Sequence, residues 1–466
     1  MSDIGTGTGT GTEANINTGT GTGTGSRPHF IVIGGGFAGL WATRALAHAP
    51  LDITLIDRAN HHLFQPLLYQ VATAGLSAPD IAAPLRQILR SQANVRVLLA
   101  EVSGINLQQQ QVTLVDGPPM PYDLLLVASG ATHAYFGHDE WAPHAPGLKT
   151  LDDALLIRRR LLLAFEHAEA AASPDEQQAW LHFAVVGGGP TGVELAGTLA
   201  EIARHTLRQE FRRIDPQQAK VRLIEAGPAL LASFPPRLQQ RTRTQLEGLG
   251  VEVLCGTPVA DITASGYRLG DSVVPCRTVL WAAGVAASPL GALLCADPGA
   301  ECDRAGRVKV NPDLSLPGHP EVFVAGDLAA LTQASGRPVP GVAPAAKQMG
   351  AHVAATLRTR LKGQPSTPFV YADYGNLATI GRMAAVVDLR GFQFSGLLAW
   401  WFWLAAHVFF LIGFRNRISV LINWAWAYWT YQRGARIVLG RDGTPSDSRP
   451  HSQGTADSSG HATTGK

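Results

Sequence analysis

The chain has 466 residues, of which 46% are hydrophobic and 16% are charged, and its formal net charge is +2. A chain of this length and apolar content can bury two or three domains. The nearly neutral charge gives no reason to expect nucleic acid as a partner. The four scattered cysteines form no CxxC pair, so we expect no metal site and interpret them as free thiols in a reducing compartment; they are Cys255, Cys276, Cys295 and Cys302.

The two ends have the composition of disordered tails. Residues 1–26 carry a Gly-Thr repeat without an apolar segment, which excludes a secretory signal there. Residues 441–466 are rich in Ser, Thr, Asp and His and are interpreted in the same way. We assign neither tail a role.

A strand–turn–helix pattern follows the first tail. Residues 29–33 are apolar and β-branched, and Gly34, Gly36 and Gly39 then have the GxGxxG spacing before helix-forming residues 40–47. Such a turn brings a pyrophosphate onto free backbone N–H groups at a helix N-terminus. A dinucleotide site is therefore predicted.

The acid that this site needs comes at the end of the next strand. Residues 53–56 form that strand and Asp57 follows it, where a carboxylate can hold both hydroxyls of an adenosine ribose. The irregular stretch 58–76 is interpreted as a loop packed by its aromatic residues. Strands are expected at 95–102 and 111–115, flanking a turn.

A further strand at 122–128 runs into Gly130, where a glycine lets the chain pass close to a bound cofactor. A helix is expected at 152–171, connecting to a second domain. The opening pattern is then repeated: strand 183–186, a glycine-rich turn, a helix that opens at Val193, and strand 221–224. The glycines of this copy and its terminal acid are Gly187, Gly189, Gly192 and Glu225.

This internal repeat predicts an α/β fold with two Rossmann-like dinucleotide-binding domains. Strands at 251–254 and 278–281 follow, the second leading to Gly284 in the way that 122–128 leads to Gly130. Strand 321–325 ends at Gly326 and Asp327, where the carboxylate can bind a ribityl or pyrophosphate hydroxyl and the chain returns to the first domain. A helix is expected up to Leu361.

The end of the chain is apolar and aromatic. Among residues 397–414 only His407 is ionisable, and residues 418–431 are again apolar after an Arg-Asn-Arg interruption. A narrow polar stripe marks the second segment: Asn416, Ser419, Asn423 and Thr430. A transmembrane helix, a pair of interfacial helices and a soluble dimer interface all remain open, and the six tryptophans favour the interfacial helices.

Several segments together resemble one known family, the type II NADH dehydrogenases. These are FQPLLYQVATAGL, GGGPTGVELAG, VFVAGD, APAAKQMG and FLIGFRNR, and the similarity covers about residues 27–440. The resemblance implies a membrane-associated, non-proton-pumping NADH:quinone oxidoreductase of the respiratory chain. It implies hydride transfer from NADH to FAD, and then two electrons to a membrane quinone.

The resemblance also implies a domain plan in which the NADH domain is inserted into the FAD domain and a helical membrane-binding segment follows. The expected divisions are a tail at 1–26, FAD domain at 27–149 and 311–366, NADH domain at 150–310, membrane-associating region at 367–440 and tail at 441–466. The protein would lie on the cytoplasmic face of a bacterial inner membrane, attached to the bilayer through residues 397–431, with a homodimer left open.

Site residues are carried over by motif. Those expected at FAD are Gly34, Gly36, Phe37, Ala38, Gly39, Asp57, Arg58, Gln65, Val102, Gly130, Gly326 and Asp327. Those expected at NADH are Gly187, Gly189, Pro190, Thr191, Gly192, Glu225 and Gly284. Glu194 and Gln348 would be catalytic, and Ala346, Lys347 and Gln348 would contact the quinone.

One position departs from the family. The quinone motif usually has two glutamines, and here the first is replaced by Pro344, which leaves Gln348 as the better candidate. Without paired redox cysteines, a sulfide:quinone oxidoreductase is disfavoured. A soluble reductase of the same fold and a non-catalytic NADH-sensing protein remain as alternatives.

Overall fold

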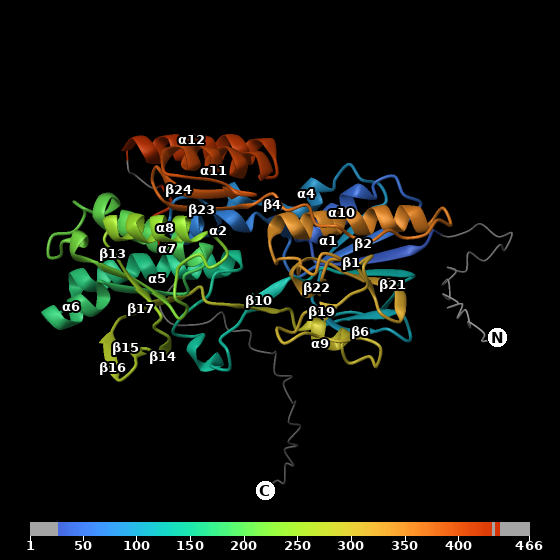
Figure 1. Cartoon of the computed structure of the whole chain (residues 1–466), viewed down its shortest axis with the longest axis horizontal. Helices are drawn as coiled ribbons and strands as arrows, with labels where there is room; N and C mark the ends of the chain where they lie inside the picture. The colour runs from blue at the N-terminus through green and yellow to red at the C-terminus, as the bar shows by residue number, and fades with distance from the viewer. Residues whose placement is uncertain (1–26, 431–433, 439–466) are drawn as a thin grey trace, which may run out of the picture.

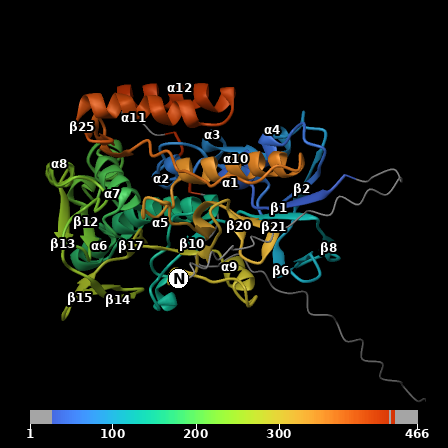
Figure 2. The same cartoon turned by 45° about the vertical axis from the view of Figure 1, so that its right-hand side comes forward.

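The computed structural model describes residues 27–430 and 434–438, so both predicted tails lie outside the described residues. Two lobes, each built around a sheet, lie side by side, and helices α11 (Leu397–Phe410) and α12 (Phe414–Thr430) lie across one side of them (Figures 1 and 2).

The first lobe contains a six-stranded sheet in the order β20-β21-β9-β1-β2-β5. Its strands are β1 (His29–Ile33), β2 (Asp52–Asp57), β5 (Val95–Leu99), β9 (Leu124–Val127), β20 (Ser315–Leu316) and β21 (His319–Val324). All neighbours are parallel except β20 and β21. Parallel strands buried on both faces explain the continuous apolar runs of β1 and β9. Because β21 pairs with β9, two distant segments complete one sheet.

Helices α1 (Phe37–Ala45) and α10 (Ala343–Arg360) pack against each other over this sheet. They approach closely, since a Cβ added to Gly350 would lie 2.1 Å from the carbonyl oxygen of Ala38. The helix predicted up to Leu361 is confirmed.

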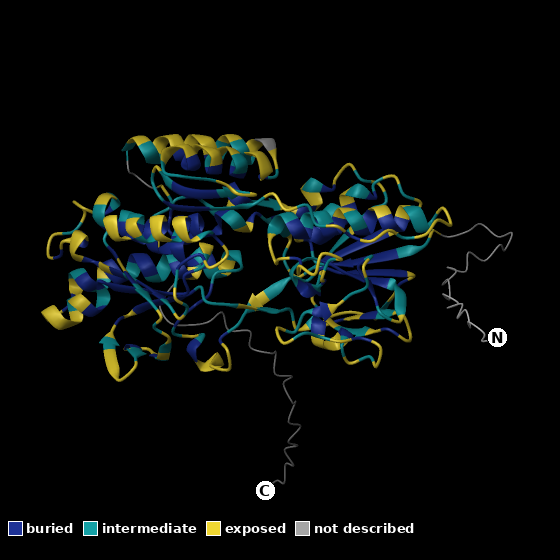
Figure 3. Ribbon diagram, viewed as in Figure 1, coloured by how far each residue is buried: buried dark blue, intermediate teal, exposed yellow. Residues whose placement is uncertain are grey.

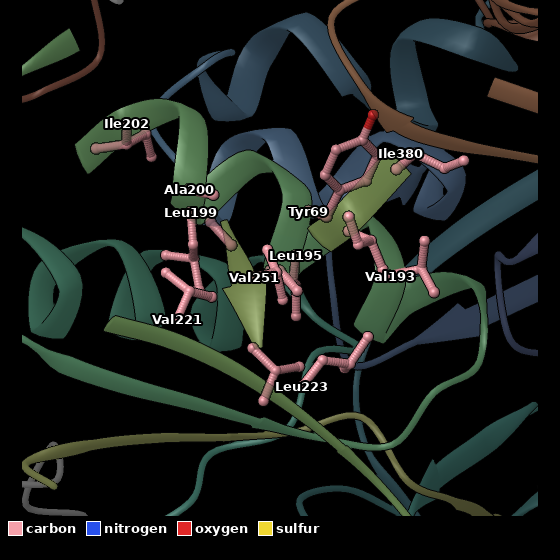
Figure 4. Close-up of a cluster of buried hydrophobic side chains, with 14 of the residues drawn as sticks. Tyr69, Val193, Leu195, Leu199, Ala200, Ile202, Val221, Leu223, Val251 and Ile380 are labelled. Atoms are coloured by element: carbon pink, nitrogen blue, oxygen red, sulfur yellow. The ribbon is translucent and has the colours of Figure 1, made fainter. Parts of the chain in front are cut away.

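The second lobe repeats the arrangement with a parallel sheet in the order β13-β12-β11-β17. Its strands are β11 (His182–Val186), β12 (Lys220–Glu225), β13 (Val251–Cys255) and β17 (Thr278–Trp281), and its main helices are α5 (Leu151–Ala170), α7 (Pro190–Glu201) and α8 (Pro236–Gly248). Figure 4 shows Leu195 and Leu199 of α7 clustered with Val221 and Leu223 of β12. The predicted pair of Rossmann-like folds is confirmed.

Two antiparallel strands, β10 (Ala131–His133) and β18 (Val285–Ala287), connect the lobes. They directly follow Gly130 and Gly284, the two glycines expected at the ends of the preceding strands. Beyond them, Leu294 and Val308 already pack in the core around the first sheet. Part of the segment expected in the second domain therefore packs with the first.

Two local predictions are wrong. The strand expected at 95–102 is divided, because the chain leaves the sheet at Ala100 and β6 (Val102–Asn106) pairs with β7 (Gln111–Leu114) in a separate hairpin. The stretch 58–76 is more ordered than a loop, since it contains η1 (Gln65–Leu67) and a buried helix α2 (Leu68–Ala72).

The C-terminal region begins with a three-stranded antiparallel sheet that the sequence analysis missed. Its strands are β23 (Asn376–Gly381), β24 (Ala384–Leu389) and β25 (Phe392–Ser395).

The remaining short elements of the two lobes are β3 (His61–Leu63), α3 (Ala78–Ile81), β4 (Ala82–Pro84), α4 (Leu85–Ile88), β8 (Met120–Pro121), η2 (Asp139–Trp141), α6 (Pro174–Trp180), η3 (Ile202–Thr206), η4 (Pro216–Gln218), β14 (Val259–Thr263), β15 (Gly266–Leu269), β16 (Ser272–Pro275), α9 (Leu290–Leu294), β19 (Val308–Lys309), η5 (Gly326–Leu328) and β22 (Ala329–Ala330).

Helices α11 and α12 have two unlike faces (Figure 3). Trp403 and Trp424 are buried against the protein, with 1% and 4% of their surface exposed. On the outer side the exposed fractions reach 69% for Phe409 and 89% for Trp429. No helix within the described residues is long and apolar enough to cross a membrane.

The interpretation of all four cysteines as free thiols is wrong. Cys295 and Cys302 form a disulfide, because the turn after α9 returns the chain until their Cα atoms are 5.8 Å apart. Cys255 and Cys276 are free. Burial raises the pKa of the Cys276 thiol to about 12, so this thiol is not reactive at neutral pH.

Candidate active site

The first glycine-rich turn joins β1 to α1. Gly34 has φ +104°, and a Cβ there would lie 2.4 Å from the carbonyl oxygen of Ala128. A Cβ on Gly39 would lie 1.9 Å from the Gly34 oxygen, whereas one on Gly36 would meet no atom within 4 Å. The turn thus needs glycine for its own geometry and leaves open space at the helix N-terminus, as a pyrophosphate requires.

The second turn, between β11 and α7, has the same geometry. Gly187 has φ +112° and lies against the backbone of Ala282, while a Cβ on Gly192 would lie 1.8 Å from the Gly187 oxygen. Gly189, like Gly36, faces open space. Helices α1 and α7 begin at Phe37 and Pro190, three residues before the positions predicted, so Ala38 and Thr191 belong to the first turns.

The two predicted ribose-binding acids hold these turns in place. Asp57 accepts hydrogen bonds from the N–H groups of Gly35 (2.5 Å) and Ala59 (2.7 Å). Glu225 accepts from Gly188 (2.5 Å) and Gly227 (2.6 Å) in the same pattern. A carboxylate has about four acceptor positions, so each acid keeps capacity for ribose hydroxyls. The fixing of the turn by its acid was not predicted.

Asp327 and Gln65, both expected near FAD, each contact Lys149, a residue that the sequence analysis missed. The Lys149 ammonium lies 3.6 Å from the Asp327 carboxylate, and the amide of Gln65 donates to the Lys149 carbonyl oxygen at 3.1 Å. A Cβ on Gly326 would contact Ala38 and Ala346, so the start of α10 lies beside the first turn. No motif in the sequence marks Lys149.

The remaining predicted cofactor positions lie at or next to the ends of strands. Arg58 is exposed next to Asp57, Val102 begins β6, and Gly130 has φ +71° after β9. A Cβ on Gly284 would lie 2.5 Å from the ring of Phe136, so this glycine admits a neighbouring side chain. Their contacts with cofactor remain predictions.

Glu194 lies where α7, α2 and the C-terminal sheet meet. Its carboxylate accepts a 3.4 Å hydrogen bond from the N–H of Thr379 in β23, and burial raises its pKa to about 8. Burial and the nearby Glu194 also raise the pKa of Tyr69, whose hydroxyl accepts from the amide of Gln70 at 2.9 Å. Glu194 is thus a neutral acid at pH 7, suited to proton donation. Thr379 and Tyr69 were not predicted.

The expected quinone residues lie on the first turns of α10. Pro344 falls in the first turn, where a helix has no hydrogen bond for its N–H to lose, so the departure from the family motif is structurally tolerated. The Lys347 ammonium lies 4.9 Å from the ring centre of Trp41 and 5.3 Å from that of Phe410 on α11. Burial lowers the Lys347 pKa. Gln348, by contrast, directs its amide at the backbone of Ala372.

A series of rings connects α11 to the first turn. The His407 imidazole stacks on Trp403 at 4.1 Å between ring centres and lies edge-on to Phe64 at 6.2 Å, and Phe64 lies 6.1 Å from Phe37. Burial lowers the pKa of His407 to about 4, so this side chain is neutral at pH 7. Helix α11 is therefore connected to the predicted FAD site through the ring of Phe64.

The sequence of the chain matches known families over nearly all the described residues. The pyridine nucleotide-disulphide oxidoreductase family matches residues 28–350, and the NDH2 C-terminal domain matches residues 374–430. The chain is 46% identical over 423 residues to the type II NADH:quinone oxidoreductase Ndh of Mycobacterium tuberculosis, covering 88% of this chain and 90% of that protein. The chain belongs to the type II NADH:quinone oxidoreductase family.

More distant members of the wider group show the same relationship. The mitochondrial internal alternative NAD(P)H-ubiquinone oxidoreductase A1 of Arabidopsis thaliana is 30% identical over 452 residues, covering 89% of this chain and 85% of that protein. Among solved structures, NDH2 from Plasmodium falciparum in complex with NADH superposes with a TM-score of 0.82 at 21% identity, covering 89% of this chain and all of that one. That likeness confirms the fold of a type II enzyme.

Proposed function

We propose that the protein binds FAD in the first glycine-rich turn and NADH in the second, and that it reduces a quinone drawn from a lipid bilayer without pumping protons. Support comes from the duplicated geometry: in both lobes a glycine-rich turn with open space is fixed by the acid of the next strand. When bound in the first turn, FAD supplies a hydride acceptor for NADH and two electrons for the quinone.

The residues of the chain have distinct tasks in this proposal. Helix N-termini and backbone N–H groups hold the two pyrophosphates, and Asp57 and Glu225 hold the riboses. Glu194, neutral at pH 7, donates a proton toward the quinone side. Lys347, at the contact between α10 and α11, favours negative charge on a quinone headgroup near Trp41 and Phe410.

The bilayer side is assigned to the outer face of α11 and α12, within the predicted attachment segment 397–431. Trp401, Phe409, Trp426 and Trp429 have exposed fractions of 56%, 69%, 59% and 89%. Exposed tryptophans on amphipathic helices suit a position at the membrane interface. We place this face peripherally on the cytoplasmic side of a bacterial inner membrane. The domain divisions are proposed as given above, except that the end of the 150–310 segment, with Leu294 and Val308, is assigned to the FAD lobe. A homodimer stays open.

The purified protein tests the proposal directly. It should contain one FAD per chain, released by denaturation, and should oxidise NADH quickly only when a short-chain quinone is added. A protein that binds no flavin would contradict the cofactor assignment. Flavin reduction by NADH without transfer to any quinone would contradict the acceptor assignment.

A further inference from the structure

A cavity of about 450 Å³ lies between α3 and the first half of α12. Gly75 and Leu76 close one side, and Gly434 and Ala435, just beyond the end of α12, close another. Its polar lining consists of Ser77, Asp80, Arg415, Asn416, Ser419 and Asn423. Asn416, Ser419 and Asn423 are three of the four residues of the polar stripe of α12, to which the proposed activity assigns no role.

The stripe is fixed by one buried carboxylate. Asp80 is only 6% exposed and accepts hydrogen bonds from the N–H and hydroxyl of Ser77 at 2.8 and 2.7 Å. From α12 it accepts the hydroxyl of Ser419 at 2.5 Å and the amide of Asn423 at 3.1 Å. Ser419 and Asn423 of the stripe therefore donate to Asp80, and this wall of the cavity is an ordered hydrogen-bonded network.

The groups left to face a ligand are mainly acceptors. Asn416 uses its amide N–H on the carbonyl oxygen of Ala82 at 3.3 Å and Asn423 uses its own on Asp80, so each keeps a side-chain oxygen. Arg415 is exposed at the rim, and no ion pair of this arginine is found within residues 27–430 and 434–438. The cavity thus joins a cation at its rim to acceptor oxygens inside.

This arrangement matches an anionic phosphate attached to a hydrogen-bond donor. Arginine binds phosphate oxygens well, and a primary ammonium donates to amide and carboxylate oxygens. The same helix carries the exposed Ile422, Trp426 and Trp429, so the cavity lies under the face assigned to the bilayer.

We propose that this cavity binds the headgroup of a phospholipid with a primary ammonium, with its phosphate at Arg415 and its ammonium at the side-chain oxygens of Asn416 and Asn423. The inference rests on the proposed membrane attachment and adds a lipid preference to it. Phosphatidylethanolamine and phosphatidylcholine have the same net charge, but only the first has ammonium donors. Preference between them therefore separates headgroup recognition from general electrostatic attraction.

The test measures sedimentation of the full-length flavoprotein with vesicles of phosphatidylcholine, with and without phosphatidylethanolamine. We expect roughly tenfold tighter binding when the ethanolamine lipid is present, as one charge-assisted hydrogen bond provides. Soluble glycerophosphoethanolamine should compete, and glycerophosphocholine should not, which removes any effect of membrane curvature. Arg415→Gln and, independently, Asn416→Leu should abolish the preference. Arg86→Gln, at an exposed position of helix α4, should retain it.

The outcomes separate this inference from the proposed function. Equal binding to both vesicle types would overturn headgroup recognition and leave membrane attachment standing. Binding to neither would overturn both. Competition by glycerophosphoethanolamine without any vesicle preference would assign the cavity to a soluble phosphate ester and overturn the lipid.

Discussion

The side-chain amide of Gln348 and the backbone of Ala372 exchange two hydrogen bonds of 2.9 Å each. They join α10 to the segment that leads into the C-terminal sheet. Gln348→Ala should therefore lower the free energy of unfolding by about 1–2 kcal/mol, measured by urea denaturation of the holoprotein. The exposed Gln364→Ala is the matched control and should change little. Unchanged stability with a raised KM for quinone would instead make Gln348 a direct quinone contact.

Lys347 should matter for the quinone and not for NADH. Its ammonium lies between the rings of Trp41 and Phe410, and cation–π contacts of this kind contribute about 0.5–2 kcal/mol. Lys347→Gln should raise KM for quinone several-fold, while stopped-flow reduction of the flavin by NADH keeps its rate. Lys347→Arg should recover most of the loss, and Lys362→Gln, two residues beyond the end of α10, should have no effect. Slower flavin reduction by NADH in Lys347→Gln would show that this lysine acts in the NADH half-reaction, which would contradict its assignment to the quinone.

Substitutions of Asp57 and Glu225 should affect different cofactors, the first FAD and the second NADH. Asp57→Ala should lower the FAD content of the purified protein, because it removes the acceptor for the Gly35 N–H of the turn and for the Ala59 N–H, as well as for the ribose. Glu225→Ala should keep its FAD and raise KM for NADH about tenfold or more, since a charge-assisted hydrogen bond contributes about 1.5–3 kcal/mol.

The wild type should strongly prefer NADH over NADPH, because the Glu225 carboxylate repels a 2′-phosphate. Glu225→Ala should narrow that preference. Equal use of both dinucleotides by the wild type, or loss of FAD from Glu225→Ala, would mean that the two turns are not assigned correctly.

Glu194 should make stability depend on pH. Its folded pKa of about 8 lies above its ordinary value of 4.5, so between these values the folded state holds a proton that the unfolded state releases. Its contribution to stability is thus fully present below pH 4.5 and is lost as pH rises toward 8. Glu194→Gln stays neutral, so its Tm relative to wild type should increase across this window. A constant difference in Tm would show that Glu194 is ionised in the folded protein.

The exposed aromatic face gives a sharper test of membrane attachment than removal of the helices, since Trp403 and Trp424 are part of the core. Replacing Trp401, Phe409, Trp426 and Trp429 with serine should reduce vesicle binding and the rate with a long-tailed quinone. The rate with a short-chain quinone should persist. Val273→Ser and Val370→Ser, at sites 71% and 76% exposed, serve as controls. Full activity with long-tailed quinone in the aromatic variant would disprove the bilayer assignment.

Local sequence patterns predicted those parts of the candidate site that are built from short continuous segments, namely the glycine-rich turns and the acids that follow the next strands. The glycines and their acids occupy adjacent strand ends, so spacing alone located Gly34, Asp57, Gly187 and Glu225. What spacing could not show is that each acid holds its own turn, because that depends on side-chain orientation. The helix starts were placed late, since helix-forming propensity is weak around glycine and proline.

Contacts between distant segments were beyond prediction. Lys149 contacts Asp327 across 178 residues, and Thr379 contacts Glu194 across 185 residues. The Cys295–Cys302 disulfide was missed because compartment and CxxC spacing were the only guides, whereas a turn brought the two together. The C-terminal sheet was missed because its strands are short and follow a break in the apolar pattern.

The pairing of β21 with β9 has a consequence for how the chain folds as it is synthesised. Strand β9 ends at Val127, yet its neighbour begins at His319, so one edge of the first sheet stays unpaired until nearly 200 more residues have emerged from the ribosome. The second sheet, by contrast, needs only residues 182–281. The inserted lobe can thus form first. Until β21 pairs with β9, the N-terminal lobe has an exposed apolar edge that can pair wrongly with other strands.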